Sequence, residues 1–150
     1  SNSKIDKVLI GIDNKAQIDV RLKPGEELFN YRISDYIKGF NFVDNTVEFY
    51  KQSIEYDLVI CSRYSTIIFE CMILNIPFIT YQHDGLYNDI YDLTKSINIP
   101  STESVSEKDT FEDLINVSKS WKKIKSCDLE YYIGDLNINN YNKFSNVLLG

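Results

Sequence analysis

The sequence is poor in the residues that build metal and redox centres. Its 150 residues include one histidine, His83, and three cysteines, at positions 61, 71 and 127. A single histidine excludes any site that needs several imidazole ligands, and the cysteines lack the C-x-x-C spacing of metal or redox motifs. Two of the cysteines lie in apolar runs, so we expect buried, reduced thiols. We therefore predict no metal site and no bound cofactor.

Glycine is also scarce, with six residues, and the glycine-dependent nucleotide and nucleophile motifs are absent. The sequence contains neither G-x-G-x-x-G nor G-x-x-x-x-G-K-[ST], and it lacks G-x-S-x-G and H-E-x-x-H. Dinucleotide binding through the usual fingerprint, P-loop hydrolysis and α/β-hydrolase chemistry therefore lose their main support.

Positive charge is in the minority, because 16 basic residues face 22 acidic ones, for a net charge of −6 and a pI near 4.8. This balance argues against a nucleic-acid partner, although a few oriented groups can still hold a small phosphorylated ligand. No apolar run approaches the roughly 20 residues that span a bilayer, and no secretory leader is visible. We expect a soluble, cytoplasmic protein, with a peripheral position at the inner membrane face as an alternative for a longer polypeptide.

Short apolar runs alternate with amphipathic segments along the chain. The pattern predicts strands over 7–13, 18–23, 40–43, 57–61 and 77–81, and helices over 26–37, 46–54, 65–74, 86–97 and 106–124. A terminal helix over 140–149 has weaker support. This alternation predicts a single α/β domain over residues 1–150, with a doubly wound, mostly parallel Rossmann-like sheet flanked by helices. In such sheets ligands bind outside the carboxyl ends of the strands.

The turn between the 57–61 strand and the 65–74 helix carries the main candidate site. It contains Ser62, Arg63, Ser65 and Thr66 at the start of the predicted helix. Helix N-termini attract anions, and hydroxyl groups and a guanidinium suit phosphate oxygens. A simple helix cap by Ser65 with a solvated Arg63 explains the same residues, so both interpretations stay open.

Three further positions are candidates for substrate binding. Glu70 is a carboxylate in an otherwise apolar helix, which either accepts hydrogen bonds from a hydroxyl-bearing ligand such as ribose or pairs with a basic side chain at the periphery. Lys23 and Glu26 bracket a Pro-Gly turn between a predicted strand and helix, where an ordinary turn is the alternative. His83 is the one imidazole of the chain, in a loop beside Asp84.

Four segments in order resemble the C-terminal nucleotide-binding half of GT-B fold glycosyltransferases. They are Val20-Arg-Leu-Lys-Pro-Gly-Glu26, Asp57-Leu-Val-Ile60, Ser65-Thr66 with Glu70, and Ile76-Pro77-Phe78-Ile79. The similarity covers residues 18–85 and is greatest to the bacterial branch that builds capsule, teichoic-acid and other surface polymers. The chain departs from that pattern at two positions: Lys23 replaces a usual histidine, and Asn75 replaces a common glycine.

The resemblance implies that Ser65 and Thr66 contact the donor diphosphate and that Glu70 contacts the sugar or ribose. It also implies a nucleotide-diphosphate sugar as ligand, and a carbohydrate or polyol-phosphate acceptor. Catalysis in this family occurs between two domains, and the chain opens on Ser1-Asn2-Ser3, which resembles a remnant of tag removal. We therefore expect an N-terminal domain in a longer polypeptide, no turnover by this domain alone, and no assignable catalytic residue.

Two alternatives remain. The Ser62-Arg63-Tyr64-Ser65 block resembles polysaccharide pyruvyltransferases, except that Ser65 stands where those enzymes have histidine. A non-catalytic interaction module is the other, using Tyr81, Tyr87 and Tyr91 as a contact patch for a protein partner or a homodimer.

Overall fold

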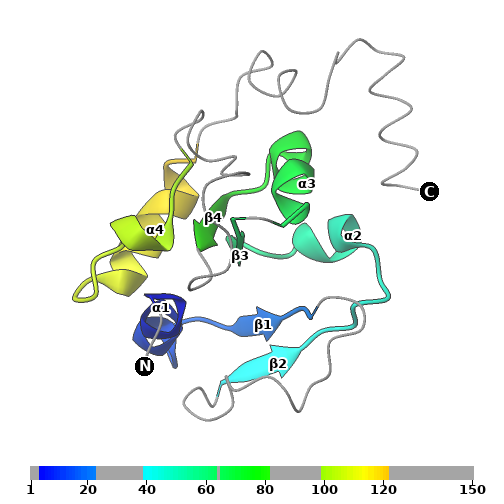
Figure 1. The fold of residues 1–150 in the computed structure, drawn as a ribbon. Helices are drawn as coiled ribbons and strands as arrows, with labels where there is room; N and C mark the ends of the chain where they lie inside the picture. Colours follow the sequence, from blue (N-terminus) through cyan, green and yellow to red (C-terminus); the bar gives the residue numbers. More distant parts are fainter. Residues whose placement is uncertain (1–3, 23–38, 64, 82–98, 122–150) are drawn as a thin grey trace.

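The computed structural model describes residues 4–22, 39–63, 65–81 and 99–121 (Figure 1). The elements in chain order are α1 (Lys4–Ile12), β1 (Ile18–Val20), β2 (Phe40–Phe42), α2 (Phe49–Ser53), β3 (Val59–Ser62), α3 (Ile67–Leu74), β4 (Phe78–Tyr81), the 3-10 helix η3 (Thr102–Ser104) and α4 (Thr110–Lys119). A mixed α/β fold is thus confirmed. The helices predicted over 26–37, 86–97 and 140–149 lie outside the described residues.

The strands form two parallel pairs. Strand β1 pairs with β2 from Ile18 opposite Phe40 onward, and β3 pairs with β4 from Val59 opposite Phe78 onward. The segment at 99–101 adds to the second pair, because the Thr80 N–H donates to the Pro100 carbonyl at 3.0 Å, next to a parallel bridge with Ser101. Three stretches of chain therefore run in the same direction through this part of the molecule.

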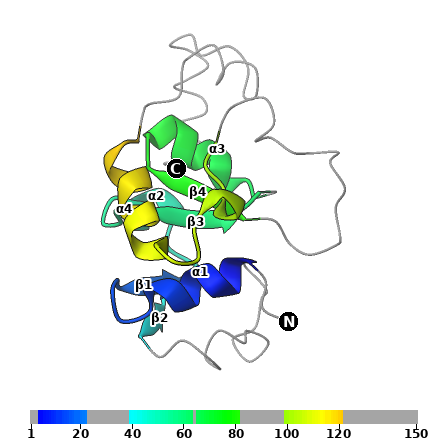
Figure 2. The ribbon, with the colours of Figure 1, turned by 90° about the vertical axis from the view of Figure 1, so that its left-hand side faces the viewer.

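Side chains of β3 and β4 alternate between two apolar cores. Ile60 and Ile79 pack in one cluster with residues of α1 and α4, which include Val8, Ile12 and Leu114. Cys61 and Phe78 pack in the other cluster with residues of α3, which include Ile68, Cys71 and Met72. Helices therefore cover both faces of the β3–β4 pair, and Figures 1 and 2 show α3 and α1 on opposite sides of it.

The predicted strand over 7–13 is wrong, because this segment forms helix α1. Val8 and Ile12 are four residues apart and bury one face of the helix against the core, with exposures of 2% and 6%. Asn14 follows with a φ of 63°, a left-handed conformation that ends the helix. A short apolar run cannot be assigned to a strand or a buried helix by composition alone.

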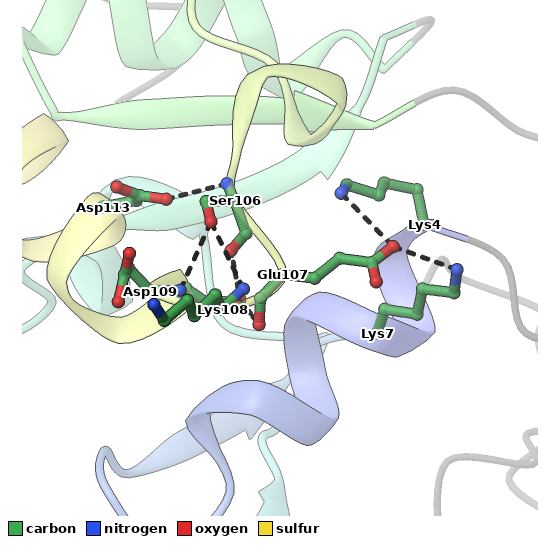
Figure 3. A network of polar contacts seen from close by, with 8 residues as sticks. Lys4, Lys7, Ser106, Glu107, Lys108, Asp109 and Asp113 are labelled. Atoms are coloured by element: carbon green, nitrogen blue, oxygen red, sulfur yellow. Dashed lines mark hydrogen bonds and ion pairs between the residues drawn. The ribbon is translucent and has the colours of Figure 1, made fainter.

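Polar contacts fasten α1 to the start of α4 (Figure 3). The Lys7 ammonium lies 3.0 Å from the Glu107 carboxylate, and Lys4 lies 3.9 Å from it. The Ser106 hydroxyl accepts the N–H groups of Lys108 and Asp109, while the Ser106 N–H donates to Asp113 at 2.7 Å. The Ser106 hydroxyl thus holds the turn that precedes α4, and the helix itself begins at Thr110 and is shorter than the predicted 106–124.

Helix α3 ends at Asn75, which has φ 54° and ψ 44°. This left-handed conformation favours glycine and tolerates asparagine, so Asn75 fits the backbone at this position. The Asn75 N–H donates to carbonyls of the last helical turn. Within the described ranges, no helix has the length and apolar character needed to cross a membrane.

Candidate functional site

Strand β3 brings the first two candidate residues to its carboxyl end. Ser62 is its last residue and is 6% exposed. The Arg63 N–H donates to the Tyr81 carbonyl at 2.8 Å, which continues the ladder one residue beyond the strand. The carboxyl ends of β3 and β4 therefore lie side by side at the edge where parallel sheets bind ligands.

Ser65 and Thr66 stand at the start of α3, but their hydroxyls have different roles. The Ser65 hydroxyl accepts the Ile67 N–H at 3.2 Å, so it caps the helix. This oxygen keeps its own hydrogen, which is still able to donate to a ligand. The exposed Thr66 side chain makes no cap hydrogen bond. The structure thus places both hydroxyls at the helix start, one occupied by the cap and one open to solvent.

The Arg63 guanidinium forms an ion pair that the sequence did not indicate. Its Nη2 lies 3.2 Å from Glu103 Oε2, with side-chain exposures of 14% and 44%. Glu103 belongs to η3, 40 residues further along the chain, and no local pattern links the two positions. A carboxylate therefore already occupies one side of the guanidinium that we expected to hold an anion.

Glu70 lies in the first turn of α3 and is partly buried. Burial raises the pKa of its carboxyl group, and the positive charge of Arg21 opposes that rise. Among the described residues, no cation lies within ion-pair distance of the Glu70 carboxylate. Glu70 was predicted either to bind a ligand hydroxyl or to pair with a basic side chain. The structure shows neither arrangement in full, since Arg21 acts on the carboxylate electrostatically without an ion pair.

The structure gives the buried thiols no reactive character. Cys61 and Cys71 are both buried and unpaired, and burial raises the pKa of the Cys61 thiol to about 12. In the part of the chain that is described, no three His, Cys, Asp or Glu side chains converge to hold a metal ion.

Several predicted residues lie outside the described ranges. Lys23, Glu26 and His83 are among them, and so are Tyr87 and Tyr91 of the alternative contact patch. Tyr81 is described at the end of β4 and is partly buried. The contact patch is therefore represented by one of its three tyrosines.

The described site combines two hydroxyls at a helix start with a guanidinium at the carboxyl end of a buried parallel strand. These are the groups that bind the oxygens of phosphate or of another small anion. Comparisons of the chain with protein-family models, with curated proteins and with solved structures found no match. We therefore interpret the site from its own residues and geometry.

Proposed function

We propose that this chain is the donor-binding domain of a glycosyltransferase that acts in bacterial surface-polysaccharide biosynthesis, and that its ligand is a nucleotide-diphosphate sugar. The observation that carries the proposal is the position of the Ser65 and Thr66 hydroxyls. They lie directly before α3 and follow the buried strand β3, where the helix dipole favours a phosphate. The ordered resemblance over residues 18–85 supports the same ligand.

We also propose that the two strand pairs form one doubly wound, Rossmann-like sheet. Its strand order would be β2, β1, β3, β4 and then the 99–101 segment. Two observations support it. Ile18 and Phe40 of the first pair share one apolar cluster with Ile60 and Ile79 of the second, and helices cover both faces of the β3–β4 pair. A continuous parallel sheet would bring the carboxyl ends of all these strands to one edge.

Each candidate residue has a role in this proposal. Ser65 and Thr66 donate to the diphosphate, and Ser62 and Arg63 form the wall beside it. Glu70 accepts hydrogen bonds from the ribose or sugar hydroxyls. Lys23, Glu26 and His83 complete the contacts with the ligand.

The domain binds the donor and does not turn it over by itself. A second domain of the same polypeptide supplies the acceptor, a carbohydrate or polyol phosphate, and closes over the donor to exclude water. The full protein acts in the cytoplasm or at the inner face of the membrane, where such polymers begin.

Titration calorimetry against UDP-, CDP- and GDP-linked sugars tests the proposal, with backbone NMR on the same samples. We expect at least one donor to bind below millimolar concentration and to shift the amide signals of Ser65 and Thr66. Inorganic pyrophosphate should shift the same amides more weakly. A folded protein that binds none of these donors at millimolar concentration would refute the proposal.

A further inference from the structure

The ion pair between Arg63 and Glu103 joins two carboxyl ends of the parallel strands. Arg63 follows β3, and its N–H donates to the Tyr81 carbonyl at 2.8 Å, so the ends of β3 and β4 lie side by side. The 99–101 segment runs parallel to β4 and is bridged to it at Ser101, and Glu103 follows this segment in η3. The carboxylate of Glu103 therefore belongs to the same edge that carries the candidate site.

The backbone that carries Glu103 is anchored on both sides. Thr102 is fully buried, and Val105 is buried in the apolar cluster formed with α1 and α4. The Val105 N–H donates to the Thr102 carbonyl at 3.2 Å, and the Ser104 hydroxyl donates to the Ser101 carbonyl at 2.7 Å. A ligand at this edge therefore meets a backbone that is held in place, with the negative charge of Glu103 attached to it.

The two charges of this pair offset one another beside the proposed diphosphate site. Arg63 Nη2 lies 3.2 Å from Glu103 Oε2, and the guanidinium is largely buried whereas the carboxylate is partly exposed. In the described part of the chain, no other cation pairs with Glu103. A pair near the protein surface is screened less than a pair in bulk water, so the carboxylate acts at short range on a ligand held beside Arg63. This corner of the site therefore offers little net positive charge to an additional phosphate charge.

The ligands that a phosphate site can hold differ in the charge of one end. In a nucleotide-diphosphate sugar both phosphates are esterified, so each has a single ionised oxygen. A free nucleoside diphosphate has a terminal phosphate that loses a second proton near pH 6, so it carries about one more negative charge at neutral pH. A carboxylate fixed next to the site therefore separates these ligands by charge, because like charges placed together disfavour one of them.

We propose that Glu103 is a specificity residue of the donor site, which neutralises Arg63 and thereby favours a diphosphate esterified at both ends over one with a terminal phosphate. This inference rests on the proposed function. The helix start cannot make this selection by itself, because hydroxyls and a helix dipole attract any phosphate. The domain then retains the intact donor in preference to the nucleoside diphosphate that transfer releases.

Three ligands separate the effect of charge from contacts with the sugar. They are the nucleotide sugar that the wild-type chain binds, the matching nucleoside diphosphate, and the methyl ester of that diphosphate at its terminal phosphate. The methyl ester has the charge of the nucleotide sugar and lacks the sugar. Competition calorimetry gives the three dissociation constants at low salt, where charge effects are largest.

Three substitutions test the carboxylate. Glu103→Gln removes the charge and keeps the shape of the side chain, whereas Glu103→Asp keeps the charge. Glu112→Gln is the matched control, because it removes one negative charge from an exposed position of α4. Neither glutamate is buried, so we expect folded proteins, which urea unfolding checks.

The wild-type chain should bind the methyl ester at least as tightly as the nucleoside diphosphate. Glu103→Gln should strengthen binding of the nucleoside diphosphate about fivefold and of the two esterified ligands about twofold, the range of a partly exposed charge interaction. The ratio of the two dissociation constants should therefore change by at least about twofold in Glu103→Gln. It should stay at the wild-type value in Glu103→Asp and Glu112→Gln, and high salt should reduce the difference between the ligands.

The outcomes distinguish this inference from the proposed function. A folded wild-type chain that binds none of the three ligands overturns the proposed function and the role of Glu103 with it. A wild-type chain that binds the nucleotide sugar, with the same ratio in Glu103→Gln or with an equal change in Glu112→Gln, overturns the role of Glu103 alone. Should Glu103→Gln unfold, the wild type supplies the second test, because a preference for the methyl ester that high salt leaves unchanged is also incompatible with selection by charge.

Discussion

Arg63 Nη2 lies 3.2 Å from Glu103 Oε2, so the end of β3 is joined to η3 by an ion pair. The arginine is largely buried, whereas the glutamate is partly exposed, with side-chain exposures of 14% and 44%. A ligand phosphate that approaches Arg63 must compete with this carboxylate. Glu103 therefore lowers the anion affinity of the site in the proposed function.

Glu103→Gln should raise the affinity for pyrophosphate and for the nucleotide sugar. We expect a gain of about two- to fivefold, the range of a partly exposed ion pair. Calorimetry at low and high salt measures it, and the gain should shrink as salt screens the guanidinium. Glu112→Gln is the control, because it removes the same charge from an exposed position of α4. Equal effects of the two substitutions on affinity would show that Arg63 does not bind the anion.

Thr66→Ala should separate ligand binding from stability. Its side chain is exposed and caps nothing, so the free energy of unfolding should change by less than about 0.5 kcal/mol. Binding of the donor should weaken about tenfold if this hydroxyl donates to the diphosphate. Ser65→Ala should weaken binding and also cost about 1 kcal/mol of stability, because Ser65 caps the Ile67 N–H. Unchanged binding in both variants would leave Ser65 as a helix cap only.

Tyr56→Phe should destabilise the protein in a pH-dependent way. The Tyr56 hydroxyl donates to the Asp19 carboxylate, and this bond, with smaller contributions from Gln17 and Asn41, lowers the pKa of Asp19 against the effect of burial. A lowered carboxyl pKa stabilises the fold above about pH 4 and loses that effect as pH falls through the folded-state value. Urea unfolding should show a loss of about 1 kcal/mol near neutral pH.

The loss in Tyr56→Phe should become smaller in acid, as Asp19 becomes protonated in the folded state. A double-mutant cycle with Asp19→Asn measures the pair directly. The coupling should be present near neutral pH and weaken as pH falls through the lowered folded-state pKa of Asp19. A coupling that is independent of pH would show that Tyr56 acts through packing alone.

Gly11→Ala tests the helical packing of α1. A Cβ at this position would lie 3.0 Å from the Thr110 Cβ and Oγ1, so the Thr110 side chain would have to shift by a few tenths of an ångström. Overpacking costs about 1–3 kcal/mol, and alanine gains roughly 1 kcal/mol of helix propensity over glycine. We therefore expect a net loss of stability of up to about 2 kcal/mol. Lys7→Ala on the same helix should cost less than about 0.5 kcal/mol, because its ion pair is exposed. A stabilised Gly11→Ala protein would contradict the close contact between α1 and α4.

Local patterns in the sequence predicted the central part of the fold. The apolar runs at 57–61 and 77–81 and the apolar segment at 65–74 correspond to β3, β4 and α3 within a few residues. These predictions succeed because a strand covered on both faces and a helix with no exposed residue leave distinct compositions over short windows. The order of the elements then placed Ser62 and Arg63 at the end of a strand and Ser65 and Thr66 at the start of the next helix, where the structure has them.

The errors and omissions arise from contacts between distant segments. The 7–13 run reads as a strand by itself, and only its packing against α4 shows why Val8 and Ile12 share a helical face. The hydrogen bonds of Arg21 to the 44–47 turn and the ion pair of Glu103 with Arg63 were not predicted, because each joins segments far apart in the sequence. No motif of fixed spacing connects such pairs, so they emerge only from the three-dimensional structure.

The left-handed turn at Asn75 has a mechanical consequence for the candidate site. Three residues, 75 to 77, join the end of α3 to the start of β4, and β4 is hydrogen-bonded along its length to β3. So short a connection leaves α3 no slack to slide along the strands. The hydroxyls of Ser65 and Thr66, at the start of α3, are consequently held in a fixed position relative to β3 and β4. Any closure around a ligand would have to be made by parts of the protein that approach this unit from outside.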